Sequence, residues 1–118
     1  MLSFLSRGRV FLAVLPADMR RSIDGLSGLV RSGLGEDPLS GDLFAFTNRR
    51  RDRIKILLWD RSGFWVLYKR LEKGTFAWPD RDDGANRAML SLEELALLLQ
   101  GIELTGLRRR RWYSGKAA

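Results

Sequence analysis

The side chains best suited to chemistry in this chain are cations, and they are concentrated between positions 49 and 73. Nine arginines and lysines stand there against three acids, a local charge of +6 in a chain whose total is +7. Guanidinium and ammonium groups bind phosphate through charge-assisted hydrogen bonds. The cluster therefore favours a surface that contacts a polyanion, and an ordinary solvated basic surface is the competing interpretation.

A second group of cations follows Gly106, where four consecutive arginines, Arg108–Arg111, and Lys116 occur without an acid. With 118 residues the chain is long enough for one modest hydrophobic core. We therefore expect a single folded domain over residues 1–106 and a basic C-terminal tail over residues 107–118. Such a tail adds sequence-independent affinity for a polyanion.

Residue types needed for several kinds of catalysis are missing. The chain has neither Cys nor His, which excludes thiolate metal sites, nucleophiles paired with histidine and imidazole acid–base chemistry. No acid stands two residues before a lysine, as in many nuclease sites, and no glycine-rich phosphate loop occurs. We expect a protein that is not an enzyme and that uses no metal or cofactor.

The N-terminal apolar run, Val10–Leu15, is too short to span a bilayer or to form a signal-peptide core. The expected location is cytoplasmic, without membrane contact.

The elements that position the cations lie between Asp42 and Pro79. Four aromatic and aliphatic runs alternate there with the turn-forming segments NRRRD, DRSG and EKG. This pattern predicts an antiparallel meander of four strands, the last containing Phe76 and Trp78.

Flanking segments complete the predicted architecture. Val10–Leu15 reads as a buried strand, and Asp18 as the cap of a helix that stops at Gly35. Near the end, Ser91 and Glu94 form a capping box for a second helix. The element order is β-α-β-β-β-β-α, which predicts an α+β fold with a mostly antiparallel sheet and helices packed on one face.

The register of the central hairpin follows from its turn. If residues 60–63 form the loop, Trp59 lies opposite Phe64, and directly opposed residues project from one face. That face carries Arg53, Lys55, Leu57, Trp59, Phe64, Val66, Tyr68 and Arg70. The other face is mostly apolar and is expected to receive the helices, with Phe76 and Trp78 joining it. The basic and aromatic face is therefore the candidate binding surface.

Two sets of candidate residues follow. The predicted DNA-binding residues are Arg49, Arg50, Arg51, Arg53, Lys55, Tyr68, Lys69, Arg70, Arg108, Arg109, Arg110 and Arg111. The predicted partner-binding residues are Leu57, Trp59 and Phe64, on the assumption that this face stays uncovered. Packing in the core is the competing interpretation for the aromatic side chains, since strands favour them.

Three motifs carry a family resemblance. PADMRRSIDGL (Pro16–Leu26), DPLSGDLFAFTNRRRDRIKILLWD (Asp37–Asp60) and YKRLEKGTFAWP (Tyr68–Pro79) resemble the TnpB-type, Orf-two-like accessory proteins of group sixty-six bacterial insertion sequences. The resemblance implies a small protein that is encoded beside a separate transposase and that supports transposition. The family motif often has glycine where this chain has Arg51, and it implies no catalytic residues.

The sequence thus predicts a non-catalytic accessory protein of bacterial insertion-sequence transposition that binds DNA, such as the ends of the element, through its basic meander. The alternative is a protein-interaction module that binds the element's transposase. A third interpretation is a nuclease-like subunit completed by a partner. Self-association is left open.

Overall fold

Seven segments of regular structure follow one another in the predicted order of strands and helices. The computed structural model describes residues 8–79 and 86–101. The elements are β1 (Val10–Ala13), α1 (Ile23–Gly33), β2 (Leu43–Thr47), β3 (Arg53–Trp59), β4 (Phe64–Arg70), β5 (Arg87–Leu90) and α2 (Leu92–Leu99).

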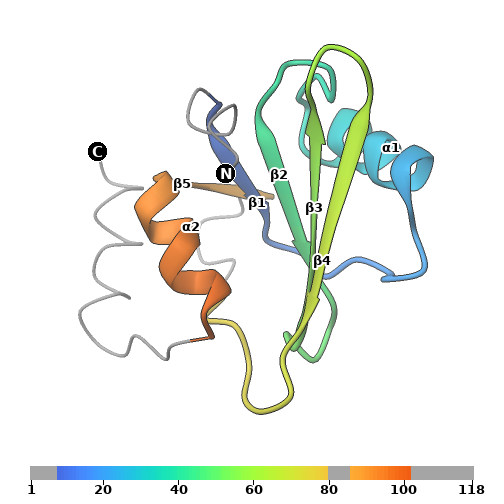
Figure 1. The fold of residues 1–118 in the computed structure, drawn as a ribbon. Coiled ribbons are helices and arrows are strands. Elements are labelled where there is room, and N and C mark those ends of the chain that lie inside the picture. Colours follow the sequence, from blue (N-terminus) through green and yellow to red (C-terminus); the bar gives the residue numbers. More distant parts are fainter. Residues whose placement is uncertain (1–7, 80–85, 102–118) are drawn as a thin grey trace.

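The five strands form one sheet in the order β4-β3-β2-β1-β5 (Figure 1). All neighbours are antiparallel except β1 and β2, which are parallel and are joined through α1. A parallel pair needs such a crossover connection, because a tight turn reverses the chain. The predicted α+β fold with a mostly antiparallel sheet is confirmed.

The predicted register of the central hairpin is confirmed as well. Trp59 lies opposite Phe64, Lys55 opposite Tyr68, and Arg53 opposite Arg70. The turn forces this parity, because the side chains of a strand alternate between the two faces of the sheet.

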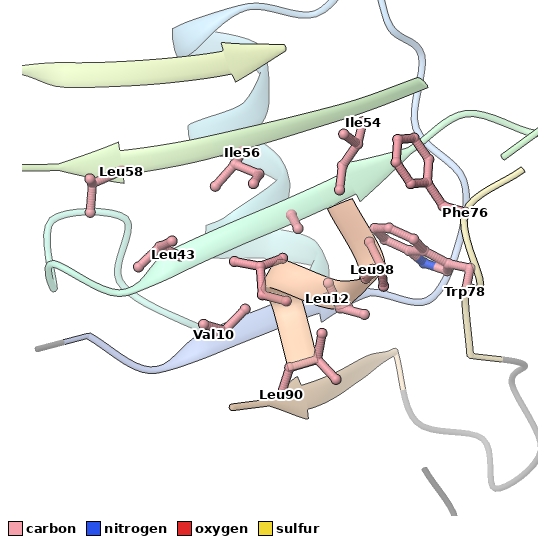
Figure 2. Packing of buried hydrophobic residues seen from close by; sticks show 12 residues of the cluster. Val10, Leu12, Leu43, Ile54, Ile56, Leu58, Phe76, Trp78, Leu90 and Leu98 are labelled. Carbon is pink, nitrogen blue, oxygen red and sulfur yellow. The ribbon is translucent and has the colours of Figure 1, made fainter. Parts of the chain in front are cut away.

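The prediction of a fourth meander strand at Phe76 and Trp78 is wrong. The segment does not pair with β4: the Phe76 N–H donates to the Arg51 carbonyl at 2.7 Å, and the Trp78 indole N–H donates to the Ala13 carbonyl at 2.8 Å. Both rings are buried, and they lie on the sheet face predicted for them (Figure 2). The remaining strand is instead β5, which pairs with β1.

The prediction that both helices pack on one face of the sheet is also wrong, because each helix covers a different face (Figure 1). On the α2 side the buried cluster consists of Val10, Leu12, Leu43, Ala45, Ile54, Ile56, Leu58, Phe76, Trp78, Leu90, Leu95 and Leu98. On the α1 side it consists of Phe11, Ala13, Leu26, Val30, Leu34, Phe44, Phe46 and Leu57.

Two-sided covering follows from the composition of the inner strands. Every residue of β1 (VFLA) and β2 (LFAFT) is buried, so neither strand has a polar face to turn toward water. Such continuous runs are typical of strands covered on both faces. At roughly 25 cal/mol per Å² of apolar surface, leaving either face open would cost several kcal/mol.

The helix boundaries are set locally. α1 begins after Ser22, so the predicted cap at Asp18 is wrong; Asp18 instead accepts the Arg20 N–H at 2.9 Å in a separate turn. Gly35 follows α1 with φ of +66°, the left-handed backbone that favours glycine, and confirms the predicted stop. The predicted capping box of Ser91 and Glu94 is present at the start of α2. Neither described helix is long and apolar enough to cross a membrane.

The buried indole of Trp78 provides a test of this core. Trp78→Ala should lower the free energy of unfolding by about 3–5 kcal/mol, because it opens a cavity and leaves the Ala13 carbonyl unsatisfied. Met89→Ala is the control: this apolar side chain of β5 is 56% exposed, so the decrease should be about 1 kcal/mol or less. Chemical denaturation of the two variants measures both, and equal decreases would contradict the assigned burial.

Candidate nucleic-acid interface

The arginine-rich turn between β2 and β3 is held by one asparagine. The Asn48 side-chain carbonyl accepts the N–H groups of Asp52 and Arg53, each at 3.1 Å, and its amide donates to Asp52 at 2.7 Å. This amide hydrogen bond holds the pKa of Asp52 below its ordinary value. Arg49 and Arg50 are exposed at the tip, so a fixed scaffold presents two cations to solvent.

Arg51 closes the turn in a conformation that is unusual for its residue type. Its φ is +62°, in the left-handed region where glycine is least strained. The turn thus carries a cation where backbone geometry alone would favour glycine.

Two arginines face each other where β3 begins and β4 ends. Arg53 and Arg70 are register partners, and the Leu71 N–H donates to the Asp52 carbonyl at 2.8 Å. Because that bond belongs to the neighbouring pair, the arginines form a non-hydrogen-bonded pair, with Cβ atoms about 4.5–5.5 Å apart. Like charges so placed destabilise a sheet. Glu72 partly offsets the repulsion by accepting from the Arg70 guanidinium at 3.1 Å.

Lys55 and Tyr68 continue the same face. The Lys55 ammonium lies 5.4 Å from the centre of the Tyr68 ring, a cation–π contact. The same ammonium donates to the Arg21 carbonyl at 2.7 Å. Tyr68 is 52% exposed, so its side chain is accessible to a ligand.

Sequence reasoning missed two arginines beside this face. Arg20 and Arg21 lie in the loop before α1, which is tied to the sheet where the Ala17 N–H donates to the Thr47 carbonyl at 2.8 Å. Arg20 forms an ion pair with Asp18 at 2.7 Å, and its hydrogen bonds hold the pKa of Asp18 well below the ordinary value. The two adjacent arginines can be read from the sequence PADMRRSIDGL. Their position beside β3 and β4 cannot, because it depends on the folded loop.

We call the resulting surface the basic end. It lies on the α1 face, at the end of the sheet where β3 begins, and it comprises Arg20, Arg21, Arg49, Arg50, Arg51, Arg53, Lys55, Tyr68 and Arg70. The acids next to these cations are Asp18, Asp52 and Glu72. Three segments that are distant in sequence thus converge on one cationic surface.

Some predicted residues do not join this surface. Lys69 projects from the opposite face, where its ammonium donates to the Leu99 carbonyl at 2.7 Å, near the C-terminus of α2. This contact is favourable, because a helix C-terminus carries unsatisfied carbonyl groups and partial negative charge. Arg108–Arg111 lie outside the described residues.

The predicted apolar patch on the α1 face does not exist as such. Leu57 has no exposed surface, because it packs against α1 residues Leu26 and Val30 in the cluster on that side. The prediction that this face stays uncovered is therefore wrong. Trp59 and Phe64 are half-buried and meet edge to face, with ring centres 5.0 Å apart.

The fold and the basic end together define a small α+β protein with a cationic surface at one end of its sheet. Comparison with known families is more specific: the chain belongs to the family described as IS66 Orf2 like protein, whose model matches residues 8–109. The resemblance noted from the three motifs is thereby confirmed. Family membership supports an accessory role in insertion-sequence transposition.

Two relatives from Sinorhizobium fredii are similar along most of their length. The uncharacterized protein y4jC is 42% identical over 106 residues, which cover 89% of each chain. The uncharacterized protein y4hO is 36% identical over 95 residues, covering 80% of this chain and 81% of its own. No solved structure matches significantly.

Substitutions at Arg51 test whether the turn imposes a left-handed backbone at this position. Arg51→Gly should change the free energy of unfolding by about 1 kcal/mol or less, because glycine adopts this φ without strain. Arg51→Val should cost about 1–3 kcal/mol more than glycine, because a β-branched side chain is strained there. Denaturant titrations measure the free energy of unfolding of each variant. A valine variant as stable as the glycine variant would show that the turn does not impose this conformation.

Proposed function

We propose that this chain is a non-catalytic accessory protein of insertion-sequence transposition that binds DNA through its basic end. Family membership supports the transposition context. The observation that carries the DNA-binding part is the direct opposition of Arg53 and Arg70, with Lys55 two residues along the same strand face. Such a concentration of like charge is unfavourable by itself and is relieved when a polyanion binds.

The shape of the basic end suits duplex DNA. β2 and β3 are inner strands of the sheet, and the turn that joins them carries Arg49 and Arg50 exposed at its tip. This turn can approach a groove although the covered sheet cannot, and arginine is a common partner of base edges and phosphates there. In the proposed complex these two arginines enter or border the groove. Arg53, Lys55 and Arg70 then contact phosphates, which fix the position of the protein without reading sequence.

The tail arginines, Arg108–Arg111, belong to the proposal as a further source of non-specific affinity. Lys69 is left out of the proposed surface, because it faces α2 on the other side of the sheet.

A second candidate is contact with the element's transposase. The observation that favours it is the half-buried pair of Trp59 and Phe64, since aromatic side chains are common anchors at protein interfaces. Leu57 takes no part in this version, because it is buried in the core.

Salt-dependent binding tests the main proposal. Replacing Arg49, Arg50 and Arg53 together with Ala should weaken binding to duplex DNA. It should also flatten the plot of log affinity against log salt by about 0.9 for every phosphate that the variant no longer neutralises. Fluorescence anisotropy with labelled duplex, repeated at several salt concentrations, measures both quantities. A folded triple variant with unchanged affinity and slope would remove the basic end from the binding site.

Arg61→Gly is a suitable control for this titration. Arg61 is exposed in the turn between β3 and β4, at the other end of the strands, and its φ of +85° suits glycine. Removing this charge should lower affinity only slightly. A decrease as large as that caused by Arg53→Ala alone would indicate that net charge, rather than the basic end, determines binding.

A further inference from the structure

The outer edge of β4 is open in the part of the chain that the structure describes. β4 is the end strand of the sheet, and within residues 8–79 and 86–101 only β3 pairs with it. Two of its aromatic side chains, Trp65 and Tyr68, are about half exposed. An open edge of seven residues is a ready template for another strand.

Two hydrogen bonds determine which backbone groups of β4 face outward. The Asp60 N–H donates to the Gly63 carbonyl, and the Leu71 N–H donates to the Asp52 carbonyl. Because hydrogen-bonded and non-hydrogen-bonded pairs alternate, the odd-numbered residues of β4 bond to β3. The N–H and C=O groups of the even-numbered residues, Phe64, Val66, Tyr68 and Arg70, therefore point away from the sheet.

We infer that β4 pairs antiparallel with β4 of a second copy of this chain, about a two-fold axis at Leu67. In this register Phe64 lies opposite Arg70 of the second copy, and Val66 opposite Tyr68. Every outward N–H and C=O group then has a partner, since four residues in each copy exchange hydrogen bonds in reciprocal pairs. Moving the axis to Val66 or Tyr68 keeps the correct parity but leaves some of these groups outside the paired segment.

The side chains of β4 are complementary to themselves in this register. Phe64 and Trp65 stand three and two residues before Leu67, and Arg70 and Lys69 stand three and two residues after it, while Val66 and Tyr68 flank it. Phe64 therefore lies opposite Arg70 of the second copy, and Trp65 lies opposite Lys69, so that the apolar stems of the two cationic side chains can pack against the aromatic rings. No like charges are directly opposed, and the two copies of Arg70 stand about 20 Å apart. This complementarity selects a second copy over an unrelated strand.

The proposed dimer does not depend on DNA binding, but it determines how the two basic ends are oriented relative to each other. Directly opposed residues share a face, so both α1 faces lie on the same side of the joined sheet. Both basic ends are then presented to the same side.

Proline substitution tests the pairing. Val66→Pro removes an outward N–H while leaving the bonds to β3 intact, and proline is tolerated at such edge positions. It should weaken the dimer at least roughly tenfold, as measured by sedimentation of the full chain. Met89→Pro is the matched control: the Val14 N–H donates to the Asn86 carbonyl, which places the Met89 N–H on the free edge of β5, and the dimer should persist.

Single cysteines test the register, because the natural chain has none. Leu67→Cys should give a disulfide-linked dimer on mild oxidation, since Leu67 faces its own copy across the axis at a distance that a disulfide spans. Arg70→Cys should give none. This measurement does not depend on whether the proline variant folds.

Several results would overturn the inference. These are a full-length chain that stays monomeric up to about 1 mM, a dimer that Met89→Pro dissociates while Val66→Pro does not, or cross-linking through position 70 rather than 67. A monomer in which truncation after Gly101 uncovers self-association would show that the C-terminal segment of the same chain occupies the edge instead.

Discussion

The structure depends on the burial of β1 and β2 on both faces. Neither strand has a polar face, so the sheet must be covered on both sides. α2 covers one face, and α1, which lies in the crossover between β1 and β2, covers the other. β3 stands at the border of this arrangement. Its α1 face is apolar at Leu57, which is covered, and cationic at Lys55 and Arg53, which are only partly buried. The basic end is therefore the part of the α1 face that the helix leaves accessible.

This arrangement also explains what the sequence could predict of the fold. Strand alternation and one turn were enough to assign the faces and register of β3 and β4, because parity depends only on local geometry. The side of the sheet that each helix covers depends on long-range packing. The continuous apolar runs of β1 and β2 indicated that both faces of the sheet are covered. The three glycines from Gly25 to Gly33 made the apolar face of α1 hard to recognise, and with it the side of the sheet that α1 covers. The prediction of a strand at Phe76 was wrong for a related reason. The aromatic side chains of this segment pack in the core, and its backbone does not pair with β4.

The candidate site was predictable to a similar extent. Arg53, Lys55, Tyr68 and Arg70 share a face because strand parity requires it, and the turn arginines must lie at the same end. Arg21 could not be placed, because only the folded loop before α1 brings its carbonyl to Lys55. The apolar patch failed because its central member is a core residue.

The central claim is that DNA contacts the basic end, and the most direct measurement is a map of backbone amide signals by NMR during titration with a short duplex. We expect the largest shifts at Arg49 to Lys55, at Tyr68 to Arg70 and at Arg20 and Arg21. Signals from α2 and from the turn at Arg61 should change little. Shifts confined to α2 or to that turn, with the basic end unaffected, would contradict the account.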